Sequence, residues 1–303
     1  MREEKRLSMV QDHPKKEHAH RKGNVLSALA TLLVLALLLA GIVYHSIDQG
    51  KREYELRFYQ MVSDRVSRNI RFVLISDLHL REYGEDNIRL IADVSALKPD
   101  VILLGGDLVT YNEDSYDNML SLCGKLAGIA PVYGVMGNHE DEKIFLDNDS
   151  ELSERFAATG VTILRNRAET LEIGDDRIEL VGVSGNASGF EKYGGRECME
   201  GLSEEYEGFR VVMAHIPTLF PDALQDYAFD LGVAGHTHGG VVRLPKFGGL
   251  YSAEEGFLPT YCGGKYALDN GGSLVVSRGM GSSGKIPRVF NLPELVVIDV
   301  NWY

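Results

Sequence analysis

The sequence is poor in cysteine. Only three cysteines occur in 303 residues, Cys123, Cys198 and Cys262, and no two of them stand in C-x-x-C spacing. This argues against a zinc knuckle and against a redox-active dithiol. Buried structural thiols are the expected state. If the body lies outside the cell, one disulfide with one cysteine left over is the alternative, and the sequence does not choose the pair.

The sequence also lacks a surplus of basic residues. It contains 31 Lys and Arg against 44 Asp and Glu, a formal net charge of −13. Broad nucleic-acid binding rests on a basic footprint, so we expect no nucleic-acid partner. Residues 1–24 carry seven basic and four acidic side chains, a net of +3, which leaves 24 basic and 40 acidic, a net of −16, for residues 25–303. The pattern predicts a basic tail over 1–24 and an acidic body.

One long segment has no charge at all. Residues 25–44 read VLSALATLLVLALLLAGIVY, and a helix of this length covers about 30 Å of hydrocarbon. The run is too long for a typical signal-peptide core and lacks a good cleavage site. It also lacks the polar stripe of a core helix. We therefore expect an uncleaved transmembrane anchor over 25–44.

The orientation of the anchor rests on a small difference in basic residues, because the side richer in Lys and Arg tends to stay in the cytoplasm. Four basic residues closely precede the run and three follow it: Lys15, Lys16, Arg21 and Lys22, then Lys51, Arg52 and Arg57. This predicts a single-pass protein of the cell membrane with its amino terminus inside and its catalytic body outside the cytoplasm.

The rest of the chain divides into a polar stalk or linker over 45–70 and one large domain over 71–303. Short apolar runs typical of buried strands recur in the domain, at 72–76, 101–104, 132–136, 161–164, 178–183, 211–214 and 231–234. Helix-compatible stretches lie between several of them, at 86–97, 114–128, 141–158 and 218–227. Beyond residue 241 glycine is dense, and SLVVS and ELVVIDV look like antiparallel strands. We expect an α/β fold with a mixed sheet, or two sheets face to face, flanked by helices.

Five of the apolar runs are followed at once by side chains that can bind metals. These side chains are Asp77, His79, Asp107, Asn138, His139, His215, His236 and His238. Ligands bind outside the carboxyl ends of strands in open α/β sheets. The sequence has nine histidines, and all those in the body stand at these five places. The pattern therefore predicts one site assembled from across the chain.

The ligand types indicate two divalent cations. Imidazole suits Zn, Fe and Mn, carboxylate and amide oxygens suit Mg and Mn, and no thiolate favours a soft metal. Seven candidate ligands are too many for one ion with an open position: Asp77, His79, Asp107, Asn138, His215, His236 and His238. Two ions sharing one carboxylate fit better, and such pairs catalyse in-line displacement at phosphorus. The expected cofactors are two divalent ions, Mn, Fe or Zn, and the expected substrate is an anionic phosphate ester.

The same residues form an ordered series of short motifs. These are D-x-H at 77–79, G-D at 106–107, G-N-H-E at 137–140, H-x-P at 215–217 and G-H-T-H at 235–238. In this order they resemble the calcineurin-like metallophosphoesterases over about 71–240. The later stretches G-H-T-H-G-G-V-V-R-L-P, Y-x-x-G-x-Y and S-R-G-M-G with N-L-P-E are similar to a membrane-anchored bacterial branch. That branch includes cell-envelope phosphoesterases and UDP-2,3-diacylglucosamine hydrolases of lipid A synthesis.

The resemblance implies a role for each motif residue. Asp77, His79 and His238 would hold the first metal, and Asn138, His215 and His236 the second. Asp107 would bridge the two metals together with a hydroxide that attacks phosphorus. His139 would be the catalytic residue that protonates the leaving oxygen or stabilises the transition state, a task for which a positioned imidazole is suited.

Further residues are candidates for binding phosphate or for supporting the site. Some relatives carry Arg or His shortly after G-D, where this chain reads Leu-Val-Thr-Tyr-Asn. Any phosphate clamp must come from elsewhere, since guanidinium groups match phosphate geometry. The candidates, each of which also fits an ordinary surface residue, are Arg243, Lys246, Lys265, Arg278 and Arg288. Glu140 fits either a group that orients a ligand or a residue at a helix start. Gly235, Gly239 and Gly240 would permit close backbone approach.

Taken together, the sequence predicts a membrane-anchored, dinuclear metallophosphoesterase that cleaves a phosphodiester or pyrophosphate, with a cell-envelope or lipid-linked phosphate as substrate. A UDP-2,3-diacylglucosamine pyrophosphatase-type hydrolase of lipid A synthesis is one alternative. A catalytically silent module that binds phosphate is another, and a one-metal hydrolase of a different bond is a third.

Overall fold

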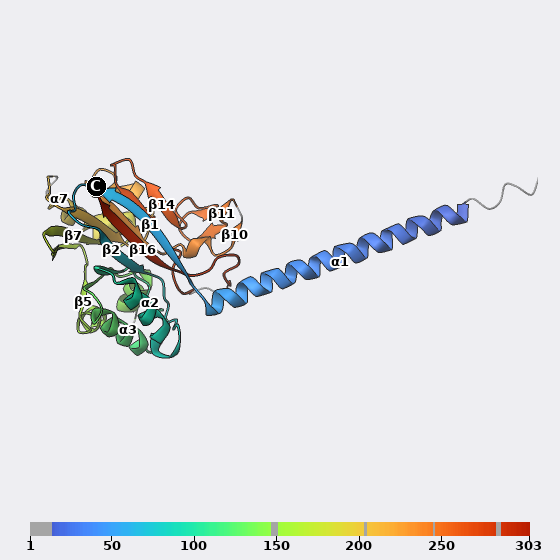
Figure 1. Cartoon of the computed structure of the whole chain (residues 1–303), viewed down its shortest axis with the longest axis horizontal. Coiled ribbons are helices and arrows are strands. Elements are labelled where there is room, and N and C mark those ends of the chain that lie inside the picture. Colours follow the sequence, from blue (N-terminus) through green and yellow to red (C-terminus); the bar gives the residue numbers. More distant parts are fainter. Residues whose placement is uncertain (1–13, 147–150, 203–204, 245, 283–285) are drawn as a thin grey trace, which may run out of the picture.

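The computed structural model describes residues 14–146, 151–202, 205–244, 246–282 and 286–303. A single long helix, α1 (Pro14–Arg52), projects from a body of strands and shorter helices (Figure 1). Within the described residues α1 alone is long and apolar enough to cross a membrane, and its apolar window from Leu26 is not buried against the body. A membrane span therefore stays a prediction from length and composition. Of the predicted basic tail, residues 1–13 lie outside the described residues.

The first sheet has six strands in the order β1-β16-β2-β3-β4-β5. Neighbouring strands are parallel except for β16 and β2, which are antiparallel. Their bounds are β1 Glu55–Ser63, β2 Ile70–Ile75, β3 Val101–Leu104, β4 Val132–Gly134, β5 Val161–Ile163 and β16 Glu294–Trp302. Strand β3 is apolar throughout and β2 is apolar from Phe72 onward, as expected for strands covered on both faces.

The second sheet also has six strands, in the order β14-β15-β9-β8-β7-β6. The central strands β15, β9, β8 and β7 are parallel, and β14 and β6 pair antiparallel at the two edges. The bounds are β6 Arg167–Ile173, β7 Asp176–Val183, β8 Phe209–Ala214, β9 Leu231–Ala234, β14 Gly264–Ala267 and β15 Ser273–Val276.

The two sheets pack face to face. Their shared core joins side chains of β2, β3 and β16 to side chains of β7, β8 and β9. Phe72 and Phe209 stack across it with ring centroids 6.4 Å apart. The predicted α/β fold with two facing mixed sheets is confirmed.

Short helices cover the outer faces. The helices α2, α3 and α5 bury side chains such as Leu90, Met119 and Phe156 against the first sheet. The helices α6, α7 and η2 pack on the second sheet through Phe190 and Phe220, among others. The bounds are η1 Glu85–Asn87, α2 Ile88–Leu97, α3 Asp117–Ala127, α4 Asn138–Leu146, α5 Leu152–Ala157, α6 Ala187–Lys192, α7 Gly195–Glu200, η2 Phe220–Leu224 and η3 His238–Gly240.

Two small hairpins follow η3 and lie beside the place where α1 joins the body (Figure 1). Their antiparallel pairs are β10 with β11 and β12 with β13. The bounds are β10 Arg243–Leu244, β11 Gly248–Gly249, β12 Tyr251–Ser252 and β13 Gly256–Phe257.

The structure differs from the expected stalk over 45–70. The helix α1 continues to Arg52, and residues 55–63 form β1, which pairs along the whole length of β16. Phe58 and Val62 on this edge strand are exposed while Tyr59 and Met61 pack toward the core. This alternation is typical of a half-buried strand, and the polar residues between the apolar ones hid it.

Smaller differences concern strand direction and helix length. SLVVS forms β15, which is antiparallel to β14 but parallel to β9. ELVVIDV lies in β16, which is antiparallel to β2 but parallel to β1. The helix expected over 218–227 is only the five-residue turn η2. All three cysteines are free, with Cys123 and Cys262 buried as expected for structural thiols.

Candidate metal centre

The candidate ligands meet at the carboxyl ends of five parallel strands. Strand β2 leads to Asp77 and His79, β3 to Asp107, β4 to Asn138, β8 to His215, and β9 to His236 and His238. Several of these residues leave the strand with a positive φ, a conformation that residues other than glycine seldom adopt. The values are 54° at Asp77, 49° at His79, 52° at Asp107, 70° at His236 and 48° at His238. Such strained backbone gathers at functional sites.

The first cluster consists of Asp77, His79 and His238, whose ligand atoms all lie within 4.8 Å of one another. The Nε2 atoms of His79 and His238 are 3.2 Å apart. The carboxylate of Asp77 is fully buried and accepts the backbone N–H of His236 at 2.9 Å and the hydroxyl of Ser76 at 2.5 Å. These bonds fix the carboxylate between strands β2 and β9.

The second cluster consists of Asp107, His215 and His236, again within 4.8 Å. His215 Nε2 lies 3.2 Å from Asp107 Oδ2 and 3.3 Å from His236 Nδ1. The Nδ1–H of His215 faces the carbonyl oxygen of Gly105 at 2.7 Å, which leaves Nε2 to point into the site. An imidazole whose other nitrogen is held in this way is oriented as a metal ligand.

Asp107 stands between the two clusters. Its Oδ2 lies 3.2 Å from His215 Nε2 of the second cluster and 3.8 Å from His79 Nε2 of the first. Its Oδ1 accepts the backbone N–H of His139 at 2.9 Å. One carboxylate oxygen is therefore shared by both groups of imidazoles.

His139 lies beside the first cluster but is not one of its three residues. Its ring meets that of His79 edge to face at 4.7 Å, and one of its nitrogens lies within 4.8 Å of ligand atoms of His79 and Asp107. The backbone N–H of Tyr111 donates to its Nδ1 at 3.2 Å. Because Nδ1 is an acceptor, a neutral ring carries its proton on Nε2.

Burial keeps most of the imidazoles neutral. It lowers the pKa of His79 to about 3 and of His236 to about 4, and it lowers the pKa of His238 well below the usual value. Burial also raises the pKa of Asp77 to about 6. Neutral imidazoles offer lone pairs, and a carboxylate short of positive neighbours is stabilised by a cation. The site is therefore arranged for positive charge that its own residues do not supply.

Asp107 and His215 are the exception, because each favours the charged form of the other. Burial alone would raise the pKa of Asp107, but the charge and hydrogen bond of His215 lower it below the usual range. Burial likewise opposes a charge on His215, yet Asp107 raises its pKa to about 10. This mutual attraction holds the shared carboxylate ionised.

The residues fit divalent cations. One buried candidate ligand atom, Asn138 Oδ1, has no hydrogen-bond partner among the described residues. Buried polar atoms without partners are costly and call for an explanation such as an ion. Asn138 Oδ1 and the imidazole nitrogens are ligand types that Mn, Fe and Zn accept.

Glu140 holds the loops that carry the shared ligand. Its buried carboxylate accepts four backbone N–H groups, those of Gly137 and Asp107 at 2.8 Å, Leu108 at 2.7 Å and Val109 at 3.0 Å. Burial raises its pKa to about 7, against the effect of these bonds. The sequence leaves two roles open for Glu140, a group that orients a ligand or a residue at a helix start. These four bonds favour the positioning role, and Glu140 also lies in the first turn of α4.

Two glycines permit the close approach of the strand ends. A Cβ on Gly235 would lie 2.0 Å from Ser76 Oγ and 2.4 Å from Asp77 Oδ2, and one on Gly137 would lie 2.2 Å from Asp107 Oδ1. No side chain fits at either position without moving a candidate ligand. The expectation for Gly235 therefore agrees with the structure, and Gly137 has the same role.

The five candidates for a phosphate clamp have different surroundings. Arg243 donates to backbone carbonyls of Gly239 and Cys262, and Arg278 pairs with Glu294 and Glu55. Lys265 reaches the carbonyl of Gln60 on β1, and Lys246 is exposed. Only Arg288 touches the cluster: its Nη2 lies 3.1 Å from His238 Nδ1, while its other donors bind the carbonyls of Gly281 and His238.

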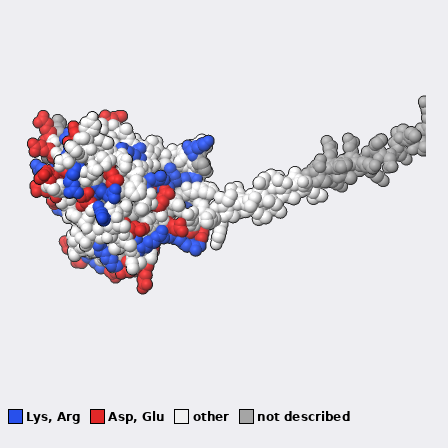
Figure 2. Space-filling view, in the orientation of Figure 1, with Lys and Arg blue, Asp and Glu red and all other residues white. Residues whose placement is uncertain are grey.

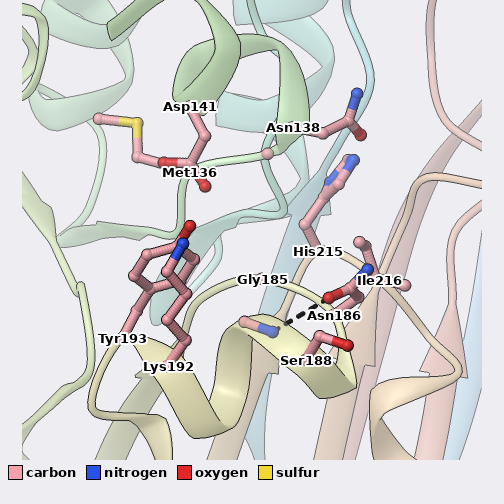
Figure 3. A pocket seen from close by; sticks show the side chains of 12 residues that line it. Met136, Asn138, Asp141, Gly185, Asn186, Ser188, Lys192, Tyr193, His215 and Ile216 are labelled. Carbon is pink, nitrogen blue, oxygen red and sulfur yellow. Dashed lines mark hydrogen bonds between the residues drawn. The ribbon is translucent and has the colours of Figure 1, made fainter. Parts of the chain in front are cut away.

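A cavity of about 360 Å³ opens beside the second cluster, between α4 and α6 (Figure 3). Asn138 and His215 form its inner wall, and Asp141, Lys192 and Tyr193 line the outer part. Asp141 is paired with Arg165 at 3.0 Å, and the ammonium of Lys192 lies over the ring of Tyr193 at 4.9 Å. Sequence reasoning missed these outer residues, because they follow no strand end and carry no motif.

Comparison with known proteins agrees with this arrangement. Residues 70–240, more than half of the chain, match the family model described as calcineurin-like phosphoesterase. The chain belongs to this family. It is a hydrolase acting on phosphoric ester bonds, and its family uses divalent metal ions.

Curated relatives cover most of the body. Phosphodiesterase YaeI of Escherichia coli K12 is 30% identical over 238 residues, 76% of this chain and 82% of that protein. The uncharacterized metallophosphoesterase YkuE of Bacillus subtilis 168 is 28% identical over 76% of this chain and 78% of its own length. Among solved structures, TT1561 of Thermus thermophilus aligns with a TM-score of 0.41 and 13% identity, over 71% of this chain and 91% of that one.

Proposed function

We propose that this protein is a membrane-anchored phosphodiesterase with a dinuclear metal site. One observation carries the proposal: Asp107 Oδ2 lies within 4 Å of imidazole nitrogens from both clusters. Asp77, His79 and His238 would hold one ion, and Asn138, His215 and His236 the other. Asp107 would serve both. The relative named phosphodiesterase supports diester cleavage, and pyrophosphate remains within the same chemistry.

The cations would supply two things when bound: charge to stabilise phosphoryl oxygens, and a lowered pKa for a nucleophilic water. The chain positions the reacting groups. Glu140 holds the Asp107 backbone by its N–H, and the His139 backbone N–H donates to Asp107 Oδ1. Positioning of this kind supplies much of the rate of phosphoryl transfer.

His139 would stabilise the leaving oxygen. Its Nδ1 accepts the Tyr111 backbone N–H, which leaves the Nε2–H to donate a hydrogen bond. Its backbone N–H is bound to Asp107 Oδ1, so its position is tied to that of the shared carboxylate. A hydrogen-bond donor fixed relative to the ligands can stabilise the charge that develops on the leaving oxygen. We therefore assign His139 as a catalytic residue rather than as a ligand.

The cavity between α4 and α6 would hold the part of the substrate that does not react. It begins at Asn138 and His215 and continues to Asp141, Lys192 and Tyr193. A cation and an aromatic ring beside polar groups suit a polar substituent with its own negative charge. This favours a diester or pyrophosphate of a cell-envelope or lipid-linked compound over a simple phosphate monoester.

Anchoring by α1 would keep the body at the membrane surface. The predicted orientation places the amino terminus in the cytoplasm and the body outside. A hydrolase of UDP-2,3-diacylglucosamine in lipid A synthesis would need its active site on the cytoplasmic side of the membrane. The orientation of the chain therefore also bears on its substrate. Protease treatment of intact cells decides the first point: loss of the body is expected, and an untouched body overturns the orientation.

The activity is tested with the purified full chain in detergent, supplied with Mn²⁺ and a chromogenic phosphodiester. We expect Asp107→Asn to lose both activity and bound metal, and His139→Ala to lose activity while keeping its metal. The matched controls Asp114→Asn and His45→Ala change exposed residues and should behave like wild type.

Three outcomes would contradict the proposal. Unaltered turnover in Asp107→Asn or His139→Ala refutes the mechanism. Wild-type protein that binds metal but cleaves no phosphodiester, pyrophosphate or UDP-diacylglucosamine is a silent binding module. One ion per chain, together with cleavage of an amide, points to the one-metal hydrolase.

A further inference from the structure

The carboxyl-terminal end of α1 is packed onto the body near the metal site. Ser46 Oγ accepts the backbone N–H of Phe290 at 2.6 Å, and the carbonyl of Gly50 accepts from Arg81 at 2.9 Å. Gly50 is buried, and the position of its missing Cβ lies 3.9 Å from the Cβ and carbonyl oxygen of Arg288. The helix therefore joins the body through contacts and not through a loose linker.

The join lies very close to the apolar run. Ser46 is two residues beyond Tyr44, the last residue of that run, and Gly50 is six residues beyond it. At 1.5 Å per residue these steps are about 3 Å and about 9 Å along an unbroken helix. The polar headgroup layer of a bilayer is about 5–8 Å thick on each side. If α1 spans the membrane, the part of the body around Ser46 and Gly50 lies among the headgroups.

That part of the body exposes large apolar side chains. We define the junction face as Ile88, Arg89, Lys246, Phe247, Ile286 and Phe290, together with Lys51 and Arg52 at the end of α1. Phe247 is 76% exposed, Ile88 69%, Ile286 63% and Phe290 43%. Single exposed apolar residues are ordinary, but a group of them marks an interaction surface.

Backbone contacts tie the junction face together. Arg89 Nη1 reaches the carbonyl of Arg52 at 3.4 Å, which places Ile88 beside the end of α1. Arg243, at the base of the hairpin that carries Phe247, donates its N–H to the carbonyl of Val289, next to Phe290. The apolar side chains thus come from separate segments that meet around one helix end.

The face is also basic, although the body is acidic. Lys51, Arg52, Arg89 and Lys246 are exposed, and of these Arg52 is paired with Asp48. Figure 2 shows Lys and Arg, with some Asp and Glu among them, on the side of the body from which α1 leaves, whereas acidic side chains are more numerous at the opposite end. Basic residues beside apolar ones are the combination that binds an anionic bilayer surface.

We infer that the junction face is a second membrane contact, docked on anionic phospholipid headgroups of the bilayer that α1 spans. The inference rests on the proposed anchoring and goes beyond it, because an anchor alone does not set which face of the body meets the bilayer. Arg288 lies against Gly50 and reaches His238 Nδ1 at 3.1 Å. The Arg288 side chain therefore separates the docked face from the metal cluster. This arrangement sets the metal site at the level of the headgroups. It favours a phosphoester of a lipid in the same bilayer as the substrate.

The test uses the single native tryptophan as its internal control. Trp302 is 61% exposed and lies at the carboxyl terminus, away from the end of α1 (Figure 1). The full chain is reconstituted into vesicles of phosphatidylcholine and phosphatidylglycerol, with or without bromine on the acyl chains. We expect wild type to emit equally in both vesicles, and the variant Phe247→Trp with Trp302→Phe to lose most of its emission in the brominated ones. Ile286→Trp with Trp302→Phe gives a second reporter.

Each result bears on the inference. Equal emission of both reporters in the two kinds of vesicle overturns it, as does equal quenching of Trp302. Quenching that persists unchanged without phosphatidylglycerol overturns the part played by the basic residues. Extraction of the wild-type chain by alkaline carbonate refutes the anchoring itself, whereas a chain that stays in the vesicles with unquenched reporters refutes only the docking.

Discussion

The substitution Glu140→Gln tests how far the site depends on one buried carboxylate. Glu140 accepts two backbone N–H groups on each oxygen, at distances of 2.7–3.0 Å. An amide keeps the shape of the side chain but replaces one acceptor oxygen by a donor. Two backbone N–H groups then lose their acceptor oxygen and face the NH₂ group of the amide. A buried donor left without a partner costs about 1–3 kcal/mol, so the expected loss of unfolding free energy is about 2–6 kcal/mol.

This loss is large enough to measure in a chain of this size. For a domain of 150–250 residues each kcal/mol lowers the melting temperature by about 2–4 °C, which gives a drop of about 5–20 °C. The freed loop carries Asp107, and a displacement of 1 Å can reduce turnover by about a hundredfold. We therefore expect reduced kcat and weaker metal binding along with the lower melting temperature.

Thermal unfolding, bound metal and kcat on a chromogenic diester are measured on the full chain in detergent. Glu142→Gln is the matched control, because Glu142 is exposed on the same helix. Wild-type melting, metal content and turnover in Glu140→Gln would refute the reasoning, since they would show that the four bonds contribute nothing.

Three further predictions concern packing, charge and metal. Gly235→Ala should lower both stability, by about 1–3 kcal/mol, and metal affinity, because its Cβ would lie 2.4 Å from Asp77 Oδ2; Gly124→Ala, where the nearest atom is at 4.0 Å, is the control, and equal melting of the two variants would contradict this. Glu294→Gln should destabilise the chain by about 1.5–3 kcal/mol, since it removes the charge of the buried carboxylate that Arg278 binds at 2.6 Å and leaves Glu55 as its charged partner; a chemical-denaturation midpoint like that of wild type would refute it. Removing metal with a chelator should lower the melting temperature, and adding back Mn²⁺ at a hundred times its Kd should restore about 2.7 kcal/mol; a melting curve indifferent to chelator would show that these clusters do not bind metal.

Much of the site could be predicted from the sequence. Asp77, Asp107 and His215 each follow an apolar run, and parallel strands deliver their carboxyl ends to one edge of a sheet. The order of the motifs then indicated the family. The ligand roles themselves stay predictions until metal is measured.

The rest depends on contacts that no local pattern records. No local pattern identifies β1 within the predicted stalk, because its pairing with β16 joins residues more than two hundred positions apart. Lys265 was a candidate clamp, but the strand β14 places it beside Gln60. The four bonds to Glu140 come from two loops, and only their position in space makes them one network.

The place of β16 has a consequence for how the protein is made. This strand is the last of the described strands in the chain, yet it lies between β1 and β2 in the first sheet. During synthesis the proposed anchor α1 would reach the membrane first, and β1 would emerge directly behind it without a partner. The pairing of β1 must wait until residues 294–302 leave the ribosome, since each of its nine residues pairs with β16.

Pairing of β1 with β16 is slow, because the long chain between them must first close into a loop. The entropy lost in this closure is offset only after the strands make contact. Until then the nascent chain, held at the membrane by the proposed anchor, carries an open strand edge, the kind of edge that aggregates or recruits a chaperone. Assembly of the first sheet therefore waits for β16, the strand that joins β1 to β2. A truncation that removes β16 should yield a chain that is degraded before it matures.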